Sequence, residues 1–184
     1  MFPKVYYFVN ELDLNYIKKI KKNIAIIYRN YSKKVDQKVL NSLKILCKRQ
    51  GRKFFLANNF KLAIKMDLDG IYIPSFNNNM NINLYKKKKK FMILGSAHNI
   101  KEIKIKEKQN VKCIFLSPIF KVKKSNKYLN IISFKNLMSK TQSEVIALGG
   151  INSKNYKKLK MLDCYGFASI SLIKQNYKFI KKII

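Results

Sequence analysis

A pair of adjacent glycines is the feature of this sequence best suited to hold a phosphate group. Gly149 and Gly150 follow a short apolar run and precede a segment expected to open a helix. Glycine lets a phosphate approach the backbone closely, and N–H groups at the start of a helix attract an anion. A tight turn without any ligand would use the same residues. A second polar segment, Ser169 to Ser171, ends the last apolar run and favours the phosphate interpretation.

The one histidine, His98, is the second candidate for chemistry. It follows Ser96 at the end of another apolar run. An imidazole can act as a general acid or base near neutral pH, provided that it has a suitable partner. A lone histidine can equally serve its own loop through hydrogen bonds, so both roles stay open.

Carboxylates for a magnesium site are scarce. The 184 residues include only nine Asp and Glu, and we expect none at a strand end where a magnesium pyrophosphate substrate would need it. Asp69 and Glu144 precede predicted strands, which places them at the wrong end. The residues after the predicted strands are mostly neutral or basic: Arg29, Asn30, Asn58, Asn59, Ser75, Asn77, Ser117, Lys123 and Lys124.

The elements that carry these residues form a regular series. Short apolar, β-branched runs alternate with longer amphipathic stretches, a pattern typical of βαβ units with a parallel sheet. Helical faces appear at Val39, Leu43, Leu46 and Cys47, and again at Ile100, Ile103 and Ile105. The stretch 77–84 lacks such a face and predicts a loop or short turn. The predicted strands are residues 4–9, 24–28, 53–57, 70–73, 91–94, 112–116, 145–148 and 166–170.

Eight such units fit either a closed (β/α)₈ barrel or a doubly wound open sheet. No glycine-rich phosphate fingerprint follows the first run, where Val9, Asn10 and Glu11 stand, and this favours the barrel. The chain has 184 residues, whereas such barrels usually take roughly 250. We therefore predict one α/β barrel domain over residues 1–184 with shortened helices, whose active site lies at the carboxyl ends of the strands.

The formal charge of +31 raises the question of nucleic acid. Lysines are spread over nearly every predicted helix, and the only arginines are Arg29, Arg49 and Arg52. A binding face would concentrate these charges, so a nucleic-acid partner ranks last among our hypotheses. The run Lys86 to Lys90 is interpreted as a solvated loop or helix end.

Cysteine usage and hydropathy predict a cytoplasmic protein. Cys47, Cys113 and Cys164 are far apart and odd in number, which indicates reduced, buried thiols and no disulfide framework or metal knuckle. No apolar segment reaches the length of about 20 residues that spans a bilayer. No signal peptide is apparent at the N-terminus, and no membrane partner is expected.

Six short segments carry a resemblance to a known family. They are Leu56 to Asn59, Asp67 to Pro74, Gly95 to His98, Leu116 to Phe120, Ala147 to Ile151 and Gly166 to Ser171. Their order and spacing resemble thiamine phosphate synthases and their TenI-like relatives over about residues 53 to 173. The resemblance implies a homodimeric barrel that couples aminopyrimidine diphosphate to thiazole phosphate, while magnesium holds the departing pyrophosphate.

The resemblance also implies roles for single residues. Arg29 matches the arginine of a Gln-x-Arg-x-Lys signature after the second strand, and Ser96 matches a serine near the pyrophosphate. We expect Arg29, Ser96 and His98 to serve catalysis. The expected substrate and phosphate contacts are Asn58 and Asn59 at the family's Asn-Asp pair, Ser117, Lys123, Lys124, and the thiazole-phosphate cup of Gly149, Gly150, Ile170 and Ser171.

Several positions depart from the family pattern. Ile27 and Tyr31 replace the signature's glutamine and lysine, and Asn59 and Asn77 stand where magnesium-binding aspartates are expected. Asparagine offers magnesium a neutral oxygen but no charge, so an Mg²⁺ site at Asn59 and Asn77 stays an open expectation. In the sixth-strand motif, Pro118 occupies the place of the catalytic histidine of thiazole tautomerases, and in the loop beyond it Val122 replaces a threonine.

Two functions follow from these observations. The first is coupling, with Arg29 and the loop lysines neutralising pyrophosphate in place of magnesium and carboxylates. The second is a TenI-like protein that binds thiazole phosphate or thiamine phosphate for salvage, tautomerisation or carriage, without coupling.

Overall fold

Eight parallel strands close into a barrel in the computed structural model, which describes residues 3–11, 13–31, 36–123 and 126–175. The order around the barrel is the order in the chain, and β1 pairs with β8 to close it. The strands are β1 (Val5–Val9), β2 (Ile24–Tyr28), β3 (Phe54–Ala57), β4 (Gly70–Ile73), β5 (Met92–Ala97), β6 (Cys113–Leu116), β7 (Glu144–Leu148) and β8 (Gly166–Ala168). The predicted barrel and its eight strands are confirmed.

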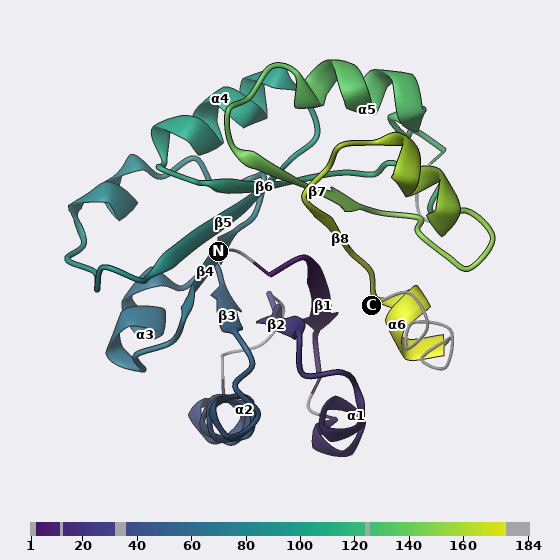
Figure 1. Ribbon diagram of the computed structural model, residues 1–184. Helices are drawn as coiled ribbons and strands as arrows, with labels where there is room; N and C mark the ends of the chain where they lie inside the picture. Colours follow the sequence, from purple (N-terminus) through teal and green to yellow (C-terminus); the bar gives the residue numbers. More distant parts are fainter. Residues whose placement is uncertain (1–2, 12, 32–35, 124–125, 176–184) are drawn as a thin grey trace.

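A short helix follows each strand and lies on the outside of the ring (Figure 1). Two of the eight, η1 and η2, are single 3₁₀ segments, which is how a short chain completes the barrel. The turn expected over residues 77–84 is confirmed by η1. The helices are α1 (Leu14–Lys19), α2 (Gln37–Arg49), α3 (Phe60–Lys65), η1 (Met80–Leu84), α4 (Ile100–Lys108), α5 (Asn130–Met138), η2 (Tyr156–Met161) and α6 (Ser171–Gln175).

Two strands end differently from the prediction. β5 continues to Ala97, so Ser96 lies within the strand and not after it. β8 stops at Ala168, two residues before the predicted end, because Ser169 begins the turn into α6. Both differences change the position of expected site residues.

Aromatic side chains fill the interior of the barrel. Tyr6 and Phe115 meet edge to face with ring centroids 4.9 Å apart, and Phe8 contacts Tyr72 in the same way at 5.1 Å. Phe55 completes the group beside Tyr6. Such contacts add about 0.5–1.5 kcal/mol per pair beyond the burial of the rings. The inner layer therefore forms a packed floor beneath the carboxyl ends of the strands.

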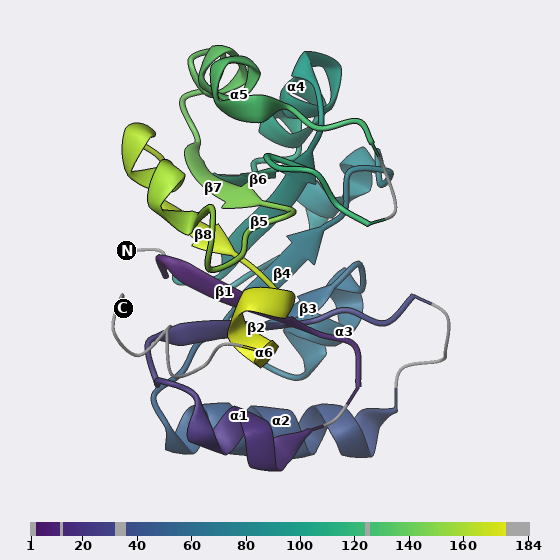
Figure 2. The ribbon, with the colours of Figure 1, turned by 90° about the vertical axis from the view of Figure 1, so that its right-hand side faces the viewer.

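A second apolar layer lies between the barrel and the helices. The predicted face of α2 is confirmed at Leu43 and Cys47, which are buried there. The predicted face of α4 is partly wrong, because Ile100 is 39% exposed and Lys106 is buried one turn beyond Ile103. The side view shows α1 and α2 side by side along the same flank of the barrel (Figure 2).

The three thiols are free, as expected. Cys47 and Cys113 are buried, and burial raises the pKa of each to about 12, so both are neutral at physiological pH. Cys164 is only half-buried, which corrects the expectation that all three are enclosed. None of the helices in the described segments is both long enough and apolar enough to cross a bilayer.

Arg52 fastens the amino end of the barrel. Its side chain is 3% exposed, and its guanidinium donates to the carbonyl oxygens of Ile17, Ile20 and Ile24 at 3.3, 3.1 and 2.8 Å. Gln50 accepts a further bond at 2.9 Å. One side chain thus joins the end of α1 and the start of β2 to the turn before β3.

Replacing Arg52 with methionine is expected to lower the free energy of unfolding by about 3 kcal/mol, because buried carbonyl groups lose their donors. Urea unfolding followed by circular dichroism measures the change. Arg49→Met, an exposed arginine on α2, is the matched control and should change stability by less than about 0.5 kcal/mol. Equal effects of the two substitutions would contradict the anchoring role.

Candidate functional site at the carboxyl ends of the strands

The barrel brings the predicted site residues to one rim. β2, β3 and β4 are consecutive neighbours, with Tyr28 beside Leu56 and Ala57 beside Tyr72. On the other side, Leu148 of β7 pairs with Ala168 of β8. Loops that begin with Arg29, Asn58 and Gly149 therefore surround a common mouth.

Arg29 lies above the aromatic floor. Its guanidinium carbon is 4.7 Å from the centre of the Phe8 ring, within the range of a cation–π contact. Arg29 is also close enough to Tyr72 to influence the pKa of that phenol. The arrangement holds a permanent positive charge directly over the apolar interior of the barrel.

Ser96 and Tyr72 lie close together in the interior of the barrel. Both residues are buried, with 5% and 3% exposed. Burial raises the pKa of Tyr72, although the nearby Ser96 hydroxyl and the charge of Arg29 oppose the shift. The phenol therefore stays protonated and can donate a hydrogen bond to a bound molecule.

An aromatic pair at the rim was not predicted. Tyr31 and Phe76 meet edge to face with centroids 5.4 Å apart, one from the loop after β2 and one from the loop after β4. They are 48% and 63% exposed. Their separation in the chain conceals the pair, and the only signal in the sequence was the position of Tyr31 two residues after Arg29. A flat heteroaromatic ring is the kind of ligand that such a wall suits.

The three asparagines after β3 and β4 are held by hydrogen bonds to the protein. Asn59 caps α3, with its Oδ1 accepting from Leu62 N at 3.1 Å. Asn77 Oδ1 accepts from Asn79 N at 2.9 Å, while its Nδ2 donates to Asn58 Oδ1 at 2.6 Å. Asn58 also has a φ of 59°, a conformation that asparagine tolerates better than most residues. All three side-chain oxygens are thus already in use.

Lys106 and Gln109 support this loop from below, and sequence patterns missed both. Lys106 is fully buried, and its Nζ donates to the Asn77 carbonyl at 2.6 Å and to Gln109 Oε1 at 2.9 Å. Gln109 Nε2 donates to the same Asn77 carbonyl at 2.9 Å. Burial lowers the pKa of Lys106 to about 8. The available signal was its place three residues after Ile103, on the same side of the helix.

The two glycines after β7 adopt positive φ angles of 94° and 70°. A Cβ on Gly149 would come within 2.6 Å of Pro118, and one on Gly150 within 2.5 Å of the Phe120 carbonyl. Close packing against the loop after β6 is therefore enough to require both. The predicted helix does not start here: η2 begins at Tyr156, so the glycines are not at a helix N-terminus.

Ser169 joins the loops after β7 and β8. Its hydroxyl donates to the Ile151 carbonyl at 3.3 Å and accepts from Leu172 N at 3.1 Å, which caps α6. Ile170 and Ser171 follow at the mouth and are exposed. The Gly150 carbonyl accepts from Asn155 Nδ2 at 2.8 Å, so an oxygen that would repel phosphate is occupied. The expected cup residues are brought together here.

The loop after β6 holds the other expected phosphate contacts. Ser117 is 8% exposed at the end of β6, and Lys123 is exposed. Lys124 lies outside the described residues. Ser117 N donates to the Ala97 carbonyl at 3.2 Å, which ties this loop to β5.

His98 is held by its own loop. Glu102 Oε2 accepts from the His98 backbone N at 2.7 Å and lies 2.8 Å from its Nδ1. Asn99 caps α4 by accepting from Glu102 N at 3.0 Å, so the three residues form a reciprocal cap. The structural role considered for His98 is therefore present, and the second ring nitrogen is the only part left for chemistry.

The carboxylates of the chain serve elsewhere. Asp13 and Asp36 cap helices, and Asp69 pairs with Lys53 at the amino ends of the strands. The expectation that no acid follows a strand is wrong for Glu11, which lies two residues after β1. β1 is not a neighbour of β3 or β4, which carry Asn59 and Asn77 in their following loops. The described residues contain no cluster of three His, Cys, Asp or Glu. The donors near Asn59 and Asn77 therefore do not match those that Mg²⁺ prefers.

The profile of the thiamine monophosphate synthase family matches residues 15–173. The chain belongs to this family. The match includes β2 to β8, and with them the loops that begin at Arg29, Asn58 and Gly149.

Curated relatives agree with this assignment. The thiamine-phosphate synthase of Methanococcus vannielii is 29% identical over 123 residues, which cover 65% of this chain and 59% of that protein. The thiamine-phosphate synthase of Fusobacterium nucleatum is 26% identical over 154 residues, which cover 82% and 74% of the two chains. The first of these alignments leaves two fifths of the relative unmatched, so activity is not transferred from it directly.

Solved structures support the fold. The thiamine phosphate pyrophosphorylase of Pyrococcus furiosus superposes with a TM-score of 0.77 at 15% identity, covering 98% of this chain and 95% of that one. The 3-hexulose-6-phosphate synthase of Salmonella typhimurium gives 0.70 at 11% identity, with coverage of 98% and 97%. At these identities the likeness concerns the barrel alone.

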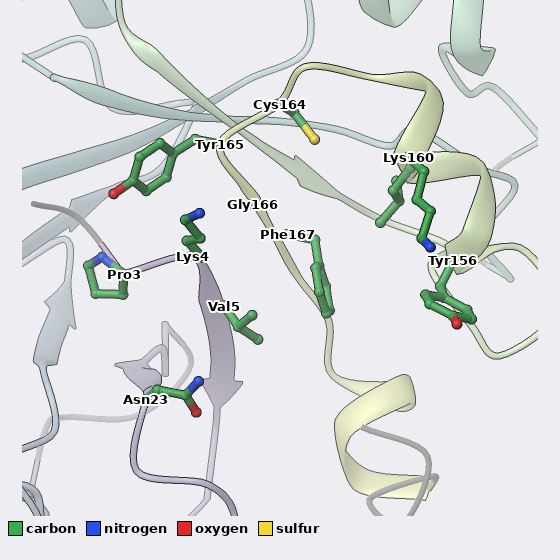
Figure 3. A pocket seen from close by; sticks show the side chains of 11 residues that line it. Pro3, Lys4, Val5, Asn23, Tyr156, Lys160, Cys164, Tyr165, Gly166 and Phe167 are labelled. Atoms are coloured by element: carbon green, nitrogen blue, oxygen red, sulfur yellow. The ribbon is translucent and has the colours of Figure 1, made fainter. Parts of the chain in front are cut away.

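A separate pocket of about 760 Å³ lies at the opposite end of the barrel. Figure 3 shows Lys4 and Val5 of the β1 end on one side and Tyr156 and Lys160 of η2 on the other, with Phe167 of β8 between them. Its walls are the amino ends of strands, where barrel enzymes do not place their chemistry. The mouth with Arg29 is therefore the candidate functional site.

The shifted pKa of Lys106 predicts a pH effect on stability. The pKa of Lys106 is about 8 in the folded chain and 10.5 for a lysine in water. Between these pH values the unfolded chain binds more protons, so the Lys106 contribution to stability rises with pH. The free energy of unfolding of the wild type, relative to that of Lys106→Met, should therefore rise by about 1.5 kcal/mol from pH 8 to pH 9.5. Urea unfolding of both proteins at each pH measures it, and a constant gap would contradict the buried-lysine assignment. Comparing the two proteins cancels the cysteine titrations, which they share.

Proposed function

We propose that this chain couples an aminopyrimidine diphosphate to thiazole phosphate at the mouth of the barrel, releasing pyrophosphate. The observation that carries the proposal is the position of Arg29, a fixed cation above the Phe8 ring in a member of the thiamine monophosphate synthase family. A developing negative charge on the leaving group is stabilised best by a charge that is already oriented. The related synthases support the same reaction class.

The substrates divide the mouth between them. The aminopyrimidine ring lies on the aromatic floor beside Tyr72 and Phe76, with its diphosphate toward Arg29. The thiazole phosphate lies at the loops of Gly149, Gly150 and Ser171, next to the basic loop that carries Lys123. The two sets of loops lie on opposite sides of the mouth, and in the proposed arrangement the thiazole nitrogen is opposite the pyrimidine methylene carbon.

The reaction then needs one bond broken and one formed. The bond between the methylene carbon and the diphosphate oxygen breaks, and pyrophosphate leaves with the electron pair beside Arg29. The thiazole nitrogen gives its lone pair to the resulting pyrimidine cation and forms the new C–N bond. Tyr72 lies beneath the ring in contact with Phe8, and the closed aromatic floor keeps water from the cation on that side.

A second function has its own support. A TenI-like protein that binds thiazole phosphate or thiamine phosphate without coupling needs only the glycine loops, and Asn59 and Asn77 in place of carboxylates favour it. Calorimetry separates the two: thiazole phosphate alone binds in this case, and no product appears on mixing. The expectations of a homodimer and of no nucleic-acid partner stay predictions.

Mixing the purified protein with both substrates should yield thiamine phosphate and inorganic pyrophosphate in equal amounts, measured by chromatography. Arg29→Met should reduce kcat/KM by about 100-fold or more, because an oriented charge is lost at the leaving group. Arg49→Met removes an exposed arginine of α2 and is the matched control, with activity unchanged. Activity of Arg29→Met within about threefold of the wild type would refute the role of Arg29.

A further inference from the structure

The amide pair between the loops after β3 and β4 has a defined orientation. Asn79 N donates to Asn77 Oδ1 at 2.9 Å, and a backbone N–H cannot bond an amide nitrogen in this way. Asn77 must therefore direct its Nδ2 toward Asn58, where the acceptor at 2.6 Å is Oδ1. It follows that Asn58 keeps its own Nδ2, a donor, for a partner from solution. This exposed residue shows no protein acceptor for that group among the described segments of the chain.

The backbone under this pair is held by a buried cation. Lys106 Nζ lies 2.6 Å from the carbonyl oxygen of Asn77, and the Gln109 amide is 2.9 Å from the same oxygen. Glu102, on the same helix, is a charged group that acts on Lys106 and favours its protonated form, against the effect of burial. A positive charge so close to the loop favours an anion above it and opposes a divalent cation.

The neighbouring strand adds charge of the same sign. Arg29 begins the loop after β2, and Asn58 begins the loop after β3, the adjacent strand. Asn59 offers no compensating acceptor, since its Oδ1 is bonded to Leu62 N. Each asparagine Oδ1 of this sector therefore already accepts a hydrogen bond from the protein, and none carries the negative charge that holds a magnesium ion. Glu11, two residues after β1 on the other side of β2, is the acid closest along the rim.

We propose that the sector formed by Arg29, Asn58 and Asn77 binds the diphosphate group as a free anion, without a divalent cation. Asn58 Nδ2 donates to a phosphate oxygen, and Arg29 supplies the countercharge. Asn77, fixed by Asn79 and by Lys106, acts as a positioning residue that sets the orientation of the Asn58 amide. The inference rests on the proposed function, because it names how the leaving group of that reaction is held.

Inorganic pyrophosphate is the probe for this sector. Calorimetric titration of the wild type at moderate salt should give the same or tighter binding in EDTA than in excess Mg²⁺, since magnesium only withdraws the free anion. Affinity that rises about tenfold or more on adding Mg²⁺ would overturn the inference. Absence of binding under both conditions would overturn it as well.

A matched pair of variants tests the amide orientation. Asn77→Asp removes the donor that holds Asn58 Oδ1, so the Asn58 amide turns inward and the sector gains a negative charge; pyrophosphate in EDTA should bind about tenfold more weakly. Asn78→Asp adds the same charge at the next, exposed position and should change affinity by less than about twofold. Equal losses in both variants would mean that net charge alone governs binding, against the inference. Thermal unfolding of both variants checks that they are folded.

The experiments distinguish failure of metal-free diphosphate binding from failure of the coupling activity. Thiazole phosphate is titrated into the same samples, and its affinity should be unchanged in Asn77→Asp because it binds at the loops after β7 and β8. Failure to form thiamine phosphate would reject coupling while metal-free pyrophosphate binding still stands. If thiamine phosphate forms but pyrophosphate binds only in the presence of Mg²⁺, coupling is supported and the metal-free site is rejected.

Discussion

Closing eight short parallel strands into a ring brings all of their carboxyl ends to one rim. In this chain closure depends on β8, which has three residues and meets β1 through the pairs Val5 with Phe167 and Tyr6 with Ala168. A ring held at one seam by so few pairs needs a well-filled interior. The aromatic side chains of Tyr6, Phe8 and Phe115 provide it, and the same rings become the floor of the site.

The scarcity of acidic residues affects both stability and chemistry. With 40 Lys and Arg against nine Asp and Glu, few carboxylates are available, and Asp13, Asp36 and Asp69 serve in helix caps and in a pair at the amino ends of the strands. Amides then take positions at the mouth that carboxylates hold in the family pattern. Because an amide presents a donor as well as an acceptor, its neighbours decide which of the two faces a ligand. The backbone N–H groups of Asn79 and Leu62 donate to the side-chain oxygens of Asn77 and Asn59, and the Asn58 amide nitrogen is left as a donor.

Lys106 connects the packing of the barrel to the site. A buried lysine is costly unless its nitrogen is fully bonded, and the Asn77 carbonyl and Gln109 satisfy it. The cost is visible in its pKa of about 8. In return, the loop after β4, which has only the 3₁₀ segment η1 in place of a helix, gains a rigid attachment to α4. Rigid support of this kind is what a binding group needs to keep its orientation.

The strands, their number, the short fourth connection and the barrel could all be predicted from the sequence. Strands buried on both faces appear as continuous apolar runs, and this signal is local. The rim residues followed as well, since their position depends only on where each strand ends. Tertiary structure alone decided that Lys106 is buried, that Tyr31 meets Phe76, that Glu102 holds His98, and that η2 starts well after Gly150. It also decided which atom of Asn58 faces the solvent. Such features depend on hydrogen bonds and contacts between elements, and a one-dimensional pattern of apolar residues carries no information about which polar atoms meet.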